Sequence, residues 1–93
     1  MISYWKKTKE IYNDCGFALI IGWYDHKNEN SGGEKAFGAH WGEYPQSRGQ
    51  LSPCVIPETT RNVILSGLLQ QAVMSGNVAQ VESIMEAIKF FKD

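Results

Sequence analysis

A thiol, an imidazole and a carboxylate lie close enough along the chain to be considered as a catalytic set. Cys54, His40 and Glu43 would supply a nucleophile, its base and a group that orients the base. However, Cys54 lies in the sequence Ser-Pro-Cys-Val-Ile-Pro, and no helix begins directly after it to activate the thiol. No family signature surrounds it either. We therefore rank a minimal Cys/His enzyme third among the functions considered and assign no catalytic residue.

A metal site would need three or four ligands at suitable spacing. Asp25 and His26 end one apolar run, His40 lies in the next, and both groups could converge with Cys54. The chain contains no Cys-x-x-Cys, His-x-x-x-His or His-Glu-x-x-His motif. It also lacks the Gly-x-Gly-x-x-Gly and Walker patterns that cradle phosphates. We therefore expect neither a metal nor another cofactor.

Aromatic rings, two imidazoles and a guanidinium gather around a predicted hairpin and the segment that follows it. Protein interfaces are enriched in Trp, Tyr and Arg, which favours a protein partner. Pockets for nucleotides or small anions use the same residue types to stack a base and hold charge, which is the alternative. A third interpretation places both tryptophans in the core. The group comprises Trp23, Tyr24, His26, His40, Trp41, Tyr44 and Arg48.

The segment from Gly42 to Pro57 is where we expect the site. Its sixteen residues include three prolines and two glycines, which predicts an ordered loop with at most a short strand near Cys54–Ile56. Long connections of this kind are often functional. Proline restricts the unfolded chain, so such a loop loses less entropy on binding. We predict five binding residues, with the two histidines at the edge of the surface: Trp41, Tyr44, Arg48, His26 and His40.

The elements that position these residues begin with a predicted helix over residues 3–14. Apolar and aromatic side chains recur there at helical spacing, with lysines on the other face. Ser3 is the expected N-cap and Gly16 the expected stop. Residues 17–25 and 35–41 are predicted to be strands that pair as a hairpin across a polar turn at residues 26–34.

The last third of the sequence predicts two helices. Thr59 or Thr60 is expected to cap the first, which runs to about Ser75 and stops at Gly76. Asn77 is expected to cap the second, because a glutamine follows three residues later as in a capping box. A link this short predicts an antiparallel helical hairpin. The expected fold class is α+β, one domain over residues 1–93 in the order α-β-β-α-α. In it, the β-hairpin is packed by the N-terminal helix and the helical hairpin.

The first of these two helices is apolar around almost its whole circumference, which is typical of a helix buried on all sides. One small domain offers few surfaces to bury it, and Phe90 points away from the apolar stripe of the second helix. We therefore expect a homodimer through the helical hairpin, with an interface formed by Leu65, Leu69 and Phe90.

Composition narrows the functional classes. The chain has 93 residues, 43% of them hydrophobic, and a net charge of −1, which suits one compact domain and excludes disorder. There is no basic excess to hold double-stranded nucleic acid and no acidic excess to imitate it. No apolar run approaches the ~18 residues of a membrane span. The two cysteines are predicted to be reduced thiols, either buried or idle, of a cytoplasmic protein.

We therefore expect a small non-catalytic binding protein that acts through protein–protein interaction. Among bacterial and viral proteins of this size, such a description is typical of inhibitors, immunity proteins and anti-defence proteins. The rival function is a small-ligand binder that holds a nucleotide or anion against the aromatic loop.

Overall fold

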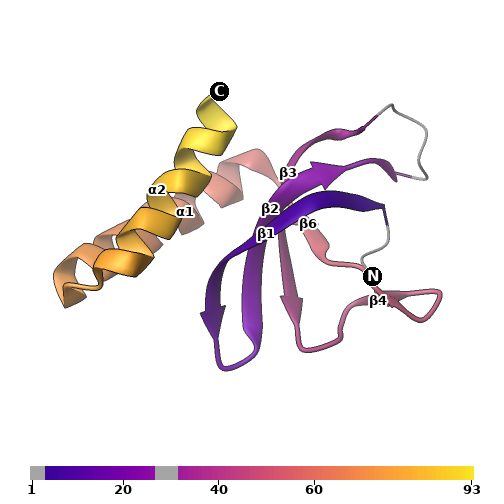
Figure 1. The fold of residues 1–93 in the computed structure, drawn as a ribbon, viewed down its shortest axis with the longest axis horizontal. Coiled ribbons are helices and arrows are strands. Elements are labelled where there is room, and N and C mark those ends of the chain that lie inside the picture. The colour runs from indigo at the N-terminus through magenta and orange to yellow at the C-terminus, as the bar shows by residue number, and fades with distance from the viewer. Residues whose placement is uncertain (1–3, 27–31) are drawn as a thin grey trace. The chain divides into compact units, whose positions relative to one another are not determined.

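In the computed structural model, strands come first along the chain and helices last (Figure 1). The structure describes residues 4–26 and 32–93. The chain divides into two compact units, Met1–Ile56 with the strands and Pro57–Asp93 with the helices. The expectation that all 93 residues form a single domain stays a prediction.

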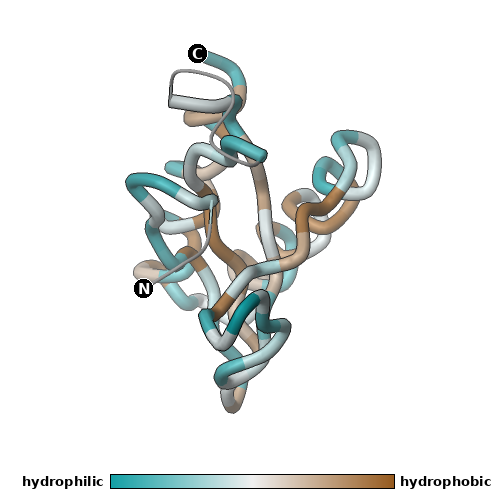
Figure 2. Tube along the Cα trace, turned by 90° about the vertical axis from the view of Figure 1, so that its right-hand side faces the viewer, coloured by the Kyte–Doolittle hydropathy of each residue, from teal (hydrophilic) through white to brown (hydrophobic). Residues whose placement is uncertain are grey.

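The first unit is built on a four-stranded antiparallel sheet. Its strands are β1 (Trp5–Asp14), β2 (Phe17–Tyr24), β3 (Glu34–Trp41) and β6 (Cys54–Ile56), in the spatial order β1-β2-β3-β6. The pairing of β2 with β3 confirms the predicted hairpin. The apolar strand β2 lies inside the sheet and the more polar β1 lies at its edge. Figure 2 colours the chain by hydropathy.

The predicted N-terminal helix is wrong, because the segment forms β1 and the element order is strands followed by two helices. The expected N-cap, Ser3, lies outside the described residues. Aromatic and β-branched residues favour a strand, and two irregularities explain the helical spacing. The register with β2 shifts between Lys6 and Lys9 and again between Glu10 and Tyr12, with one extra residue on β1 each time. A bulge turns a spacing of two into three, which imitates the helical period.

Gly16 does not end a helix but completes the turn between β1 and β2. Cys15 and Gly16 form a two-residue turn with left-handed φ angles of 52° and 99°, as hairpins of this length require. The side-chain oxygen of Asn13 accepts a hydrogen bond of 3.1 Å from the backbone N–H of Gly16. Gly16 therefore follows the end of an element, as the sequence indicated, but that element is the strand β1 and not a helix.

Trp5 organises one face of this sheet. It is 5% exposed and packs with Ile20 and Ala36, against which Tyr24 also lies. Its indole N–H donates a hydrogen bond of 3.1 Å to the carbonyl oxygen of Pro53. A single buried side chain therefore links the first strand of the sheet to the segment that leads into the last.

The segment between β3 and β6 contains a small hairpin of its own. Strands β4 (Gln46–Ser47) and β5 (Gln50–Leu51) pair across a turn at Arg48 and Gly49. The expected short strand at Cys54–Ile56 is confirmed as β6. The predicted ordered loop therefore contains the β4–β5 hairpin and the strand β6, which are joined to each other and to β3 by segments that contain proline.

The second unit is a helical hairpin of α1 (Glu58–Ser75) and α2 (Val78–Lys92), which lie side by side in Figure 1. The expected caps at Thr59 or Thr60 are wrong, because α1 begins after Pro57 with no side-chain cap. The other two signals are confirmed. Gly76 ends α1 with a φ of 71°, and the Asn77 side chain accepts a hydrogen bond of 3.1 Å from the N–H of Gln80. Within the described chain, neither helix combines the length and apolar character needed to cross a membrane.

Candidate functional site

Three exposed aromatic side chains lie side by side at one end of the sheet. Phe17 in β2 pairs directly with Trp41 in β3, and Trp41 pairs in turn with Tyr44. Directly paired residues direct their side chains to the same face. The three residues are 42%, 50% and 58% exposed. We call Phe17, Trp41 and Tyr44 the aromatic row.

Backbone hydrogen bonds hold this row in place. The N–H of Trp41 donates to the carbonyl of Tyr44 at 2.7 Å, and the N–H of Tyr44 donates to the carbonyl of Trp41 at 3.1 Å. The N–H of Gly42 donates to the carbonyl of Gly16 at 3.0 Å, which fastens the next turn to the turn between β1 and β2. The tyrosine therefore belongs to the end of the sheet, although it follows the last residue of β3.

Arg48 lies beyond the row, at the tip of the β4–β5 hairpin. Its φ is 53° and its side chain is exposed. A hollow of about 450 Å³ lies between this hairpin and the turn that follows β3. Its described lining includes one carboxylate and no cationic side chain. This lining would repel a small anion and is better suited to contact with a protein partner. The lining residues are Gly42, Glu43, Gln46, Gly49, Gln50 and Leu51.

The structure does not bring the two predicted histidines together. His40 is half-buried, pairs across the strands with Ala18, and contacts the carbonyl of Gly42 through Nδ1 at 3.2 Å. Because it is adjacent to Trp41 in β3, its side chain points to the opposite face of the sheet. His26 lies beyond the far end of β2, where its Nδ1 is 3.2 Å from the hydroxyl of Tyr24. The strand between them, from residue 17 to 24, spans roughly 23 Å.

The catalytic set considered from the sequence is not assembled. Cys54 in β6 pairs with Ala39 in β3, so the adjacent His40 points to the other face of the sheet from the thiol. Of the two alternatives predicted for the cysteines, buried or idle, burial is wrong. Cys15 and Cys54 are both exposed and unpaired as disulfides, the first in a turn and the second in an edge strand.

The hypothetical metal ligands are separated in the same way. Asp25 is buried, and its carboxylate lies 3.2 Å from the ammonium group of Lys6. It shares the far end of β2 with His26, whereas His40 lies near the aromatic row. Among residues 4–26 and 32–93, no cluster of three or more His, Cys, Asp or Glu side chains could hold a metal ion.

The residues expected at a dimer interface are largely covered. Leu65 is 3% exposed, while Leu69 and Phe90 are half-buried. The ring of Phe90 meets Phe91 edge-on at 5.0 Å between centroids, and the guanidinium of Arg61 lies 4.0 Å from the Phe91 ring. Other apolar side chains of the two helices are exposed, namely Val63, Val73, Met74, Val78 and Met85.

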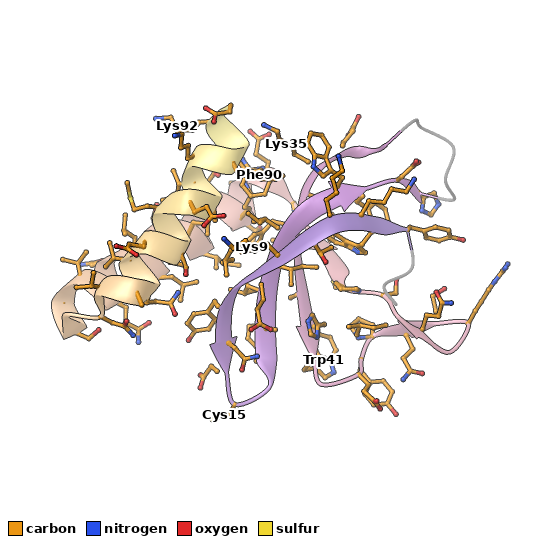
Figure 3. The ribbon with its side chains drawn as sticks, viewed as in Figure 1. Lys9, Cys15, Lys35, Trp41, Phe90 and Lys92 are labelled. Atoms are coloured by element: carbon orange, nitrogen blue, oxygen red, sulfur yellow. The ribbon has the colours of Figure 1, made fainter. Side chains whose placement is uncertain are left out.

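Phe17 is the residue of the row that the sequence did not single out, because it begins an apolar run typical of a buried strand. Its exposure follows from its position beside the Cys15–Gly16 turn, at the end of the sheet. Figure 3 labels Cys15 and Trp41 at this same end. No local sequence signal identifies it, because its place opposite residue 41 depends on the register of the β2–β3 hairpin.

Comparison of the chain with protein-family models, curated proteins and solved structures finds no match. The arrangement of its own residues therefore carries the case for a function.

Proposed function

We propose that this protein is a non-catalytic binding protein that recognises a protein partner through the aromatic row. The observation that carries the proposal is the exposure of three adjacent large aromatic side chains, Phe17, Trp41 and Tyr44. Exposed apolar patches on small proteins mark interaction surfaces, and tryptophan and tyrosine are the residue types that most often anchor protein interfaces. The aromatic row thus has both the residue types and the solvent exposure that are typical of a protein contact surface.

The rigid backbone of the row supports this proposal. Phe17 and Trp41 lie in paired strands, and Tyr44 is held by two backbone hydrogen bonds to Trp41. A preorganised surface loses little conformational freedom when a partner binds. Aromatic side chains have few rotatable bonds, so their immobilisation adds little further cost. Both properties increase the affinity obtained from a small contact area.

Acidic groups border the row and indicate the chemistry of the partner. Asp14 in β1 pairs with Phe17, and Glu43 lies in the turn between Trp41 and Tyr44. Both carboxylates are exposed. We propose a partner surface with an apolar hollow for the rings and cationic side chains at its rim. Charges at the rim of an interface mainly accelerate association.

The arrangement favours binding over the thiol chemistry considered from the sequence. Cys54 and His40 direct their side chains to opposite faces of the sheet, so they do not form a nucleophile and base. A binding protein without catalysis acts by occupying the surface of its partner. This is the mode of inhibitors, immunity proteins and anti-defence proteins, the group to which we assign this chain.

The proposal is tested with Trp41→Ala and Tyr44→Ala. The parent protein, immobilised, is used to isolate partners from the source cells, and the purified partner is then titrated against each variant by calorimetry. Truncating a central aromatic anchor costs about 2 kcal/mol of binding free energy, or roughly thirtyfold in affinity. We expect a loss of this size for each variant, with an unchanged melting temperature.

Met85→Ala serves as the matched control, because Met85 is as exposed as Trp41 but lies in α2. We expect it to bind like the parent. A partner that binds the parent, both aromatic variants and the control with equal affinity would show that the row is not the contact surface.

A further inference from the structure

A second group of side chains lies at the end of the sheet opposite the aromatic row, near the predicted binding residue His26. Lys6 in β1 and Lys35 in β3 are the direct cross-strand neighbours of Trp23 in β2. The three side chains therefore share one face of the sheet. The ammonium group of Lys35 lies 5.9 Å from the centroid of the Trp23 ring. Figure 3 labels Lys35 at the end of the sheet remote from Trp41.

The first bulge of β1 adds another cation to this group. Lys7 lies between the paired residues Lys6 and Lys9, has a left-handed φ of 52°, and is exposed. Bulges commonly redirect a side chain next to a functional site. Lys6 and Lys7 line a hollow of about 230 Å³ together with Trp23, Gly32 and Gly33. A tryptophan and two lysines thus line one small hollow.

Among the described residues that line the hollow, the charged ones are Lys6 and Lys7. The ammonium group of Lys6 lies 3.2 Å from the carboxylate of Asp25, whose side chain is only 2% exposed. This contact fixes Lys6 at the wall of the hollow. Lys7 contributes a second lysine to the lining of the hollow. An anion entering the hollow therefore meets Lys7 beside the ion pair of Lys6 with Asp25.

We propose that this hollow binds a mononucleotide, with its base against Trp23 and its phosphate at the ammonium groups of Lys6 and Lys7. Tryptophan stacks on any nucleobase, and lysine holds phosphate as a point charge. A volume of about 230 Å³ is below the range of sites for drug-sized ligands, which favours one nucleotide over a dinucleotide. One ring offers one stacking platform, and a net charge of −1 does not suit a long nucleic acid.

The test uses adenosine, guanosine, cytidine and uridine monophosphates as probes of the parent protein, titrated by calorimetry at low salt. We expect at least one of the four monophosphates to bind. The corresponding nucleoside and inorganic phosphate are each expected to bind at least about tenfold more weakly, because each keeps only half of the contacts. Binding is expected to weaken as salt is added, since the lysines are exposed to solvent. Inorganic phosphate that binds as tightly as the best monophosphate would overturn the proposal.

Lys7→Gln removes the charge while keeping most of the side-chain length, and Lys9→Gln makes the same change on the same strand outside the hollow. We expect Lys7→Gln to weaken monophosphate binding about tenfold, the loss of one charge-assisted contact, and Lys9→Gln to leave it within about twofold. Because Lys7 is exposed, its variant is expected to keep the parent melting temperature. Absence of binding by all four monophosphates, or equal binding by the two variants, would also overturn the proposal.

Discussion

The indole ring of Trp5 occupies the space that a side chain at Gly38 would need. A β-carbon built on Gly38 would lie 2.7 Å from two ring atoms of Trp5, Cη2 and Cζ2. Such a distance is well inside van der Waals contact, so glycine is required here by the close approach of the ring. The absence of a side chain in β3 thus allows a tryptophan in β1 to reach the carbonyl of Pro53.

Gly38→Ala is expected to destabilise the protein. The added methyl group must displace the Trp5 ring or the strand, and overpacking of this kind costs about 1–3 kcal/mol of unfolding free energy. Gly67→Ala is the control, because a β-carbon there meets nothing within 4 Å in the middle of α1. Alanine is a better helix former, so it is expected to stabilise by about 1 kcal/mol. Urea unfolding measures both changes.

The same experiment in a Trp5→Phe background isolates the contact. Phenylalanine lacks the ring atoms that crowd position 38, so Gly38→Ala is expected to cost less there than in the parent. Residues in contact show interaction energies of about 0.5–3 kcal/mol. If the changes in unfolding free energy caused by the two substitutions were additive, the proposed contact between Trp5 and position 38 would be contradicted.

Asn77→Ala is expected to lower the unfolding free energy by about 1 kcal/mol, because it removes the side-chain acceptor for the N–H of Gln80 at the start of α2. Thr60→Ala is expected to change it by less than about 0.5 kcal/mol, since α1 begins at Pro57 without a side-chain cap. Thermal unfolding of the Thr60 variant decides between this start of α1 and the threonine cap that the sequence favours, and the Asn77 variant shows the size of a real cap.

Cys15→Asn is expected to stabilise the β1–β2 hairpin. Cys15 has a φ of 52° in a two-residue turn and is exposed. Asparagine tolerates this conformation better, and Asn-Gly is the favoured pair for such turns. The gain is expected to be about 0.5 kcal/mol in unfolding free energy. Cys54→Asn, in an extended strand, is the comparison that is expected to show no gain.

Self-association through α1 stays a prediction, and the structure changes the residues that would carry it. Val63 and Met74 are 69% and 80% exposed and lie three turns apart on one stripe of the helix. We expect sedimentation to give twice the 10.5 kDa mass of one chain. Val63→Lys combined with Met74→Lys is expected to return the protein to one chain, whereas Thr59→Lys is not. A folded parent with the mass of one chain would refute the dimer.

The sequence predicted the elements whose signals are local. The apolar run from Phe17, the αL glycine at position 76 and the cap at Asn77 each act within a few residues, and all three are confirmed. The strand β1 was missed because its bulges depend on pairing with β2, which no local period shows. The short strands β4 and β5 likewise depend on each other and not on propensity.

Part of the candidate site could be predicted from residue type, and the part that depends on strand pairing could not. Trp41 and Tyr44 were singled out by residue type, and the structure places them next to each other. The position of Phe17 beside them depends on hairpin register across a nine-residue turn, which the sequence does not fix. The separation of His26 from His40 depends on the same register, since His40 pairs with Ala18 near the start of β2 and His26 lies beyond its end.

The two edges of the four-stranded sheet bear on how the folded protein behaves at high concentration. An exposed strand edge can act as a template on which a strand from another molecule assembles, and this is a route to aggregation. In the described sheet, one edge is β1, where the two bulges interrupt the ladder and Lys7 turns the backbone left-handed. The other edge, β6, has only three residues. Neither edge offers an incoming strand a continuous row of backbone groups, so the irregular first strand protects the folded protein from amyloid-like stacking.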